Sequence, residues 1–125
     1  MISIDFVLII HDNLIENHGG SKGVRDQNLL ESAINRPFAT FDGTDLYEDG
    51  IKKASAIFES VLINHPFVDG NKRTAFALMV FMLSVHNLEL NIDETTLYDF
   101  IISATKGEKD FDNIESWLRS NTIKK

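Results

Sequence analysis

The chain has 125 residues, of which 43% are hydrophobic, and carries a formal net charge of −7 at pH 7. This length and apolar content suit a single domain with a packed core, whereas the acidic charge argues against non-specific nucleic-acid binding, which needs a broad basic surface. The chain contains no cysteine, which excludes disulfides and zinc–thiolate sites and makes a reducing compartment the natural expectation.

The N-terminus shows no signal-peptide pattern. The longest apolar run, AFALMVFML, falls far short of the roughly 20 residues that a membrane span needs. We therefore expect a cytoplasmic protein.

The first part of the chain predicts two helices. Residues 3–18 repeat apolar side chains at helical spacing, with Ser3 as a candidate N-cap and Gly19–Gly20 as the end. After a glycine-rich loop, a second helix is predicted to start at Asp26 or Asn28.

The second helix and the segment after it are bounded by turn-forming residues. Asn28 and Glu31 have the spacing of a capping box, and Pro37 closes the helix because the residue before a proline avoids helical geometry. Residues 37–49 mix aromatic residues, glycine and acids without a clear period. We expect an extended or hairpin-like connection there.

Two longer helices follow, separated by a proline-containing turn. A helix over residues 50–64 has one apolar stripe, and Pro66 ends the helical pattern. The next helix, over residues 71–86, is apolar nearly all round, as in a helix surrounded by others.

The C-terminal part predicts two more helices. The stretch LELNI could form a short strand, although no partner strand is evident. Asn91 and Glu94 resemble a capping pair that opens a helix reaching residue 105, and a last helix covers residues 111–120. The predicted fold is all-α: a single compact domain over residues 1–125, a bundle of about six helices with a buried central helix.

The turn before the central helix, NHPFVDGNKRTAF, raises the question of function. Lys72 and Arg73 lie together at the predicted start of that helix. A helix N-terminus already carries partial positive charge, so cations there are unfavourable by about 0.3–1 kcal/mol each. A negatively charged ligand would resolve this conflict.

Most residues of this turn have a structural explanation as well as a functional one. His65 can cap the preceding helix or accept a proton from a hydroxyl, and Asp69 can cap a turn or hold Mg²⁺. Gly70 permits a positive φ or close approach of a ligand. Asn71 is a candidate N-cap whose amide could instead face a phosphate.

Taken together, these residues predict phosphate chemistry. Free amides at a helix start, a glycine turn, Lys72 and Arg73 form an anion site by geometry. His65 and Asp69 add a candidate base and a candidate metal ligand within a few residues. The P-loop pattern G-x-x-x-x-G-K-[ST] does not occur in the chain.

The stretch HPFVDGNKR resembles the Fic motif, H-x-F-x-[D/E]-G-N-[G/K]-R, at every defined position. IHDNLIENHGGSKGVRDQNLLESAINRPF also resembles the N-terminal half of the Doc (death-on-curing) branch of the Fic/Doc family, whose members are toxins of toxin–antitoxin pairs. The resemblance implies that His65 is the general base and that Asp69 binds Mg²⁺. It further implies that Gly70, Asn71 and Arg73 cradle the phosphates of ATP.

Two positions resemble the Doc branch rather than AMP-transferring members. Lys72 stands where those members usually have a second glycine, and Phe76 stands where they usually have a second arginine. The resemblance therefore implies transfer of the γ-phosphate of ATP to a Ser or Thr hydroxyl, with translation elongation factor Tu as the target. AMP transfer and a catalytically silent binding module remain alternatives.

The resemblance also concerns regions outside the motif. In Fic proteins a flap aligns the target segment, often by strand addition; here its candidates are Arg36, Phe38 and Phe41, although both aromatic residues could equally fill the core. No good match to the inhibitory pattern [S/T]-x-x-x-E-[G/N] occurs in the chain, so a separate antitoxin protein is expected. His11 and His18 lie seven residues apart without a third metal ligand, which makes a metal site there unexpected.

Overall fold

The computed structural model describes residues 2–125 and is predominantly α-helical, as predicted. Within that range the α-helices are α1 (Ile4–His18), α2 (Gln27–Asn35), α3 (Gly50–Asn64), α4 (Asn71–Val85), α5 (Glu94–Thr105) and α6 (Phe111–Asn121). A short 3₁₀ helix, η1 (Arg36–Phe38), follows α2. The strands are β1 (Thr40–Phe41), β2 (Thr44–Asp45), β3 (Leu88–Leu90) and β4 (Thr122–Lys124).

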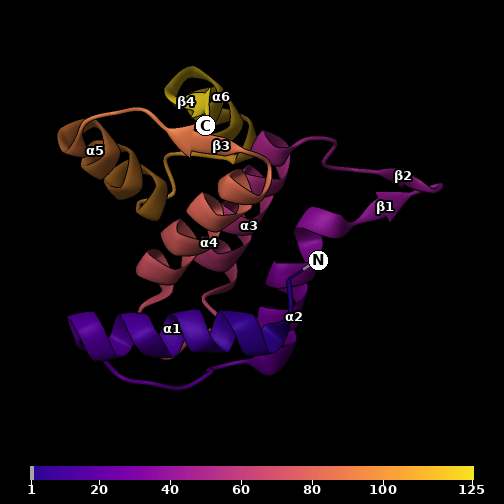
Figure 1. Ribbon diagram of the computed structural model, residues 1–125. Helices are drawn as coiled ribbons and strands as arrows, with labels where there is room; N and C mark the ends of the chain where they lie inside the picture. Colours follow the sequence, from indigo (N-terminus) through magenta and orange to yellow (C-terminus); the bar gives the residue numbers. More distant parts are fainter. Residues whose placement is uncertain (1) are drawn as a thin grey trace.

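The helices α3 and α4 lie side by side at the centre of the molecule (Figure 1). At one end of this pair, α1 crosses near the connection between the two helices, whereas α5, α6 and the β3–β4 pair lie toward the other end. No helix within residues 2–125 is both long and apolar enough to cross a membrane.

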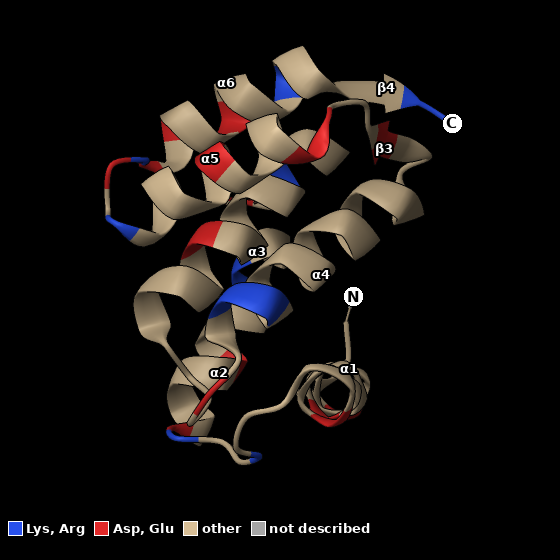
Figure 2. Ribbon diagram, turned by 90° about the vertical axis from the view of Figure 1, so that its left-hand side faces the viewer, with Lys and Arg blue, Asp and Glu red and all other residues tan. Residues whose placement is uncertain are grey.

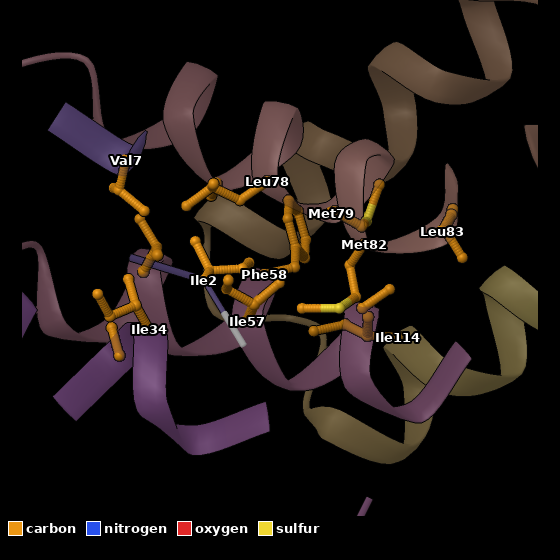
Figure 3. Close-up of a cluster of buried hydrophobic side chains, with 14 of the residues drawn as sticks. Ile2, Val7, Ile34, Ile57, Phe58, Leu78, Met79, Met82, Leu83 and Ile114 are labelled. Atoms are coloured by element: carbon orange, nitrogen blue, oxygen red, sulfur yellow. The ribbon is translucent and has the colours of Figure 1, made fainter. Parts of the chain in front are cut away.

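The core fills the space between α3 and α4 and extends toward α1, α2 and α6 (Figure 3). Its largest fully buried side chains include Phe58 and Ile57 from α3 and Leu78, Met79 and Met82 from α4. The predicted central helix is confirmed in position, although its Val80 and Val85 remain exposed. Since core residues such as these are held on many sides, the ends of α3 and α4 are fixed relative to each other.

Side-chain caps begin five of the six α-helices in the described range: Ser3, Asp26, Asp49, Asp93 and Asp110 each accept a backbone N–H two or three residues into the helix. Ser3 was predicted as a cap, and Asp26 was one of the two predicted starts of the second helix.

Two predicted capping pairs are wrong. Asp26, not Asn28 with Glu31, caps α2, and Asp93, not Asn91, caps α5. In both cases an aspartate stands two residues from the chosen asparagine, and the extended backbone at the aspartate places its carboxylate over the first helical amides.

The connection between α2 and α3 contains the expected hairpin, in which β1 pairs antiparallel with β2 through Thr40–Asp45 and Phe41–Thr44. It projects from the body of the molecule (Figure 1). The stretch LELNI does contain a strand, and the partner that was not evident from the sequence is β4 at the end of the chain. Pairing between strands that are far apart in the sequence produces no local sequence pattern, so it could not be predicted.

Candidate functional site

The turn between α3 and α4 adopts a backbone conformation that most residues avoid. His65 ends α3 in the left-handed region, with φ 50° and ψ 54°, and its N–H donates to the Val61 carbonyl. This geometry costs a non-glycine residue roughly 1–2 kcal/mol. His65 therefore caps α3, as its structural explanation held, and its exposed ring also lies at the cavity described below.

The segment after α1 holds this turn from outside. Arg25 donates from Nε to the His65 carbonyl at 2.7 Å and from a terminal nitrogen to the Asn64 carbonyl at 2.8 Å. The Arg25 N–H donates to Pro66, and Val68 donates its N–H to Gly23 at 3.0 Å. A guanidinium on the last carbonyls of α3 also complements the helix dipole, which offsets part of the strain at His65.

A cavity of about 440 Å³ opens beside the turn and is lined by His65 and residues 68–73. This volume falls in the range of small-molecule sites, roughly 300–1,000 Å³. Lys72 and Arg73 both line it, so the two cations share one cavity. Figure 2 shows them as a blue turn at the start of α4, in a protein of net charge −7.

The first turn of α4 differs from that of the other five α-helices in residues 2–125, because no side chain caps it. Gly70 is the N-cap residue, and Asn71 is already helical, so the prediction of Asn71 as N-cap is wrong. The backbone amides of this turn therefore receive no hydrogen bond from an N-cap side chain. The residues that carry them line the cavity together with the side chains of Lys72 and Arg73. Such a turn attracts an anion.

Gly70 adopts the positive φ predicted for it, and it also packs closely against α1. Its φ is +76°, and a Cβ there would lie 3.0 Å from Ile15 Cδ1 and 3.5 Å from His11 Nε2. Any other residue would combine backbone strain with crowding against α1.

Asp69 is exposed at the mouth of the turn and is held by two backbone amides. Its Oδ2 accepts from Ser21 N–H at 3.1 Å, and its Oδ1 accepts from Gly70 N–H at 2.8 Å. These two hydrogen bonds, helped by the charge of Arg73, lower the pKa of Asp69 below its usual value. The carboxylate is therefore ionised at neutral pH.

The residues present fit a magnesium ion. Mg²⁺ takes one or two protein carboxylates and completes its shell with phosphate oxygens and water. An ionised carboxylate beside an anion-attracting turn supplies that donor set. Each Asp69 oxygen accepts only one hydrogen bond here, which leaves lone pairs for a metal.

Asn71 lies buried beneath His65 and uses its whole side-chain amide internally. Its Oδ1 accepts from Phe67 N–H at 2.9 Å, and its Nδ2 lies 3.0 Å from the Phe67 carbonyl and 3.1 Å from His65 Nδ1. Because Oδ1 must face the Phe67 N–H, the nitrogen is the atom that faces the histidine ring. In this arrangement the side chain of Asn71 braces the turn.

The same contact determines where neutral His65 carries its proton. The Asn71 nitrogen is a donor, so His65 Nδ1 acts as the acceptor and Nε2 holds the hydrogen. Nδ1 can accept a proton from a substrate only after its contact with Asn71 is released, and Nε2 can do so only after the ring exchanges tautomers.

The three predicted flap residues lie in different environments. Arg36 donates to Tyr47 Oη, Glu59 and Ser60, and so anchors the base of the hairpin on α3. Phe38 packs against the core, whereas Phe41 on β1 is 76% exposed. Only Phe41 of this set offers free apolar surface for a target.

Sequence reasoning missed the residues that hold the turn from α1 and the following loop. Ser21 and Arg25 act through a backbone amide and a guanidinium on distant residues, and His11 contacts Phe67 and Asp69. The only available signal was a histidine in the buried stripe of a helix, at the spacing of Val7 and Ile15.

Comparisons with known proteins agree with this geometry. The model of the Fic/DOC family matches residues 1–83, which include the whole turn and all the residues lining the cavity. This chain belongs to the Fic/DOC family.

Two relatives lie within the Doc branch of this family. The chain is 37% identical over 102 residues to Toxin Doc of Mycolicibacterium smegmatis, covering 80% of this chain and 78% of that protein. It is 28% identical over 121 residues to Protein kinase doc of Escherichia phage P1, covering 94% of this chain and 92% of that protein. The second match reaches beyond the family model and takes in most of the chain.

Proposed function

We propose that this Fic/DOC protein transfers the γ-phosphate of ATP to a Ser or Thr hydroxyl of a protein. The observation that carries the proposal is the cavity at the start of α4, where Lys72, Arg73 and an uncapped helical turn face the same space as His65 and Asp69. Phosphoryl transfer depends mainly on positioning and charge stabilisation, and these are the groups such a site needs.

The basic residues would bind the phosphate chain of the nucleotide. Lys72 supplies a compact positive charge, while Arg73 supplies a planar set of donors that suits phosphate oxygens. Arg73 also donates to the carbonyl of Gly19, the residue that caps the end of α1, at 3.3 Å.

His65 would receive the proton of the target hydroxyl. As the hydroxyl oxygen forms its bond to the γ-phosphorus, the bond from that phosphorus to the bridging oxygen breaks and ADP leaves. The hydroxyl proton passes to the bare ring nitrogen, which requires the ring to have released its contact with Asn71 or exchanged tautomers first. General base catalysis of this kind is typically worth about 10²–10⁴ in rate.

Asp69 is the residue that would hold Mg²⁺. When bound, the ion would offset negative charge on the phosphates. The backbone amides of Ser21 and Gly70 keep the Asp69 carboxylate ionised and fixed in orientation. The proposed metal ligand is therefore preorganised.

Two further parts of the proposal rest on the Doc branch. One relative is named a protein kinase and another a toxin. We infer that the target is translation elongation factor Tu, whose modification would arrest translation, and that a separate antitoxin protein restrains the activity. The exposed hairpin with Phe41 is the surface proposed for docking the target segment.

AMP transfer to the same hydroxyl is the second candidate function. The observation against it is the position of Phe76, which lines an apolar groove with β3 and the start of α5 instead of the cavity. A phenylalanine there cannot supply the positive charge that AMP-transferring relatives place at this position.

Labelled ATP tests the choice between these functions. The protein is incubated with elongation factor Tu, Mg²⁺ and ATP labelled at either the α- or the γ-phosphorus, with His65→Ala as control. We expect label on the target from γ-labelled ATP alone and none with His65→Ala. Label from the α-phosphorus would overturn phosphate transfer in favour of AMP transfer, and label from neither, also in a whole-cell extract, would favour a silent binding module.

A further inference from the structure

His11 occupies an unusual place in α1. It lies between Val7 and Ile15 in the buried stripe of the helix and is 1% exposed. A polar ring costs free energy when it is removed from water unless its nitrogen atoms find partners. An apolar side chain at this position would fill the stripe without that cost, so the contacts of the ring are informative.

The ring touches the candidate site in two ways. It stacks on Phe67 with a centroid distance of 3.9 Å and an interplanar angle of 8°. Its Nε2 lies 2.7 Å from the backbone carbonyl of Asp69. Because a carbonyl only accepts hydrogen bonds, Nε2 carries the hydrogen and donates it.

These contacts fix both sides of the residue that would hold the metal. The Asp69 carbonyl accepts a hydrogen bond from His11 Nε2, and the Asp69 carboxylate accepts hydrogen bonds from the backbone N–H groups of Ser21 and Gly70. The peptide unit that follows Asp69 leads into Gly70, whose φ of +76° sets the start of α4. Rotation of this peptide unit would therefore withdraw the Gly70 N–H from Asp69 Oδ1 and change the backbone angle with which α4 begins.

We propose that His11 is a positioning residue of the site: its Nε2–H holds the Asp69 peptide unit in the orientation that the carboxylate and the α4 amides need. This role rests on the proposed function for its effect on catalysis, but the contact itself does not. His11 acts only through Asp69 and Phe67 and touches no substrate.

Two substitutions separate the hydrogen bond from the packing. His11→Phe keeps a flat ring against Phe67 but has no donor, whereas His11→Gln can bring an N–H to the Asp69 carbonyl but has no ring. If His11 only fills space in the core, His11→Phe should be the better replacement in both stability and kcat, because it preserves the buried apolar contact.

The proposal predicts opposite orders for stability and catalysis. In urea, His11→Phe should unfold at a midpoint at least as high as that of His11→Gln. In transfer of label from γ-labelled ATP, kcat of His11→Phe should be about tenfold lower than that of His11→Gln, with a smaller change in KM for ATP. The proposal is overturned if kcat follows the order of stability or if both variants retain the parent's kcat.

A measurement on the unsubstituted protein needs neither activity nor variants. Long-range ¹⁵N–¹H NMR of the histidine rings should show His11 as the Nε2–H tautomer, with a slowly exchanging ring N–H. His11 found with its hydrogen on Nδ1, or with a ring N–H in rapid exchange with water, would overturn the proposal even if no nucleotide chemistry is found. Conversely, the expected tautomer together with no label transfer would count against the proposed function and leave the contact standing.

Discussion

Asn71→Ala tests whether the internal bracing of the turn holds the site together. The substitution removes the amide that accepts from Phe67 N–H and donates to the Phe67 carbonyl and toward His65. Asn71 is 3% exposed, so both Phe67 groups would lose their partners in a buried environment. At about 1–3 kcal/mol for each of these two buried groups left unpaired, we expect a loss of roughly 2–6 kcal/mol in the free energy of unfolding.

The assay is urea unfolding followed by circular dichroism, with Asn64→Ala as the matched control. Asn64 makes a single side-chain donation, from Nδ2 to the Leu29 carbonyl at 3.2 Å. Its loss should cost about 0.5–1.5 kcal/mol. With a slope of about 2 kcal/mol per molar urea, the Asn71→Ala midpoint should fall by roughly 1–3 M. Equal shifts for the two variants would show that the Phe67 and His65 contacts of Asn71 do not stabilise the turn.

Three further predictions concern the same turn. Gly70→Ala should destabilise the protein by more than Gly107→Ala, because both positions have φ +76° but only at Gly70 does the new Cβ meet a side chain, at 3.0 Å; equal losses in urea unfolding would contradict this. The hydrogen bonds that lower the pKa of Asp69 stabilise the fold above about pH 4, and this contribution is lost as pH falls through the lowered pKa. The stability difference between the parent protein and Asp69→Asn, measured by urea unfolding from pH 7 to pH 3, should therefore shrink toward low pH, and a constant difference would refute the assignment. Arg73→Ala should reduce label transfer from γ-labelled ATP at least as much as His65→Ala, since a charge-stabilising arginine is worth about 10³–10⁵ in other phosphoryl transfers and a general base about 10²–10⁴; parent-like turnover in Arg73→Ala would reject this ranking.

The helical framework could be predicted because its signals are local. The periodicity of residues 50–64 and 71–86 placed α3 and α4 with ends within one residue of those observed. Ser3 was recognised as a cap because a cap needs only its own helix start. The choice of Asn91 over Asp93 went wrong because pattern alone does not tell which of two neighbouring cap-forming residues has the extended backbone.

The sequence predicted which residues form the candidate site, but it did not predict the contacts that hold them in place. The nine-residue motif brought His65, Asp69, Lys72 and Arg73 into one loop, and the structure places all four at one cavity. The sequence could not reveal that residues from α1 and the loop after it hold that turn, because these contacts join positions 40 to 58 residues apart. The internal role of the Asn71 side chain was likewise hidden, since a motif records which residue is present and not which way it faces.

The pairing of β3 with β4 makes the last residues of the chain part of the fold. Residues 88–124 form a closed loop whose two ends are hydrogen-bonded to each other, and α5 and α6 lie within it. Lys125 extends this closure through its N–H to the Asn87 carbonyl and its Nζ to Ser84. Deletion of residues 122–125 would remove β4 and leave α5 and α6 attached to the rest of the chain through a single connection.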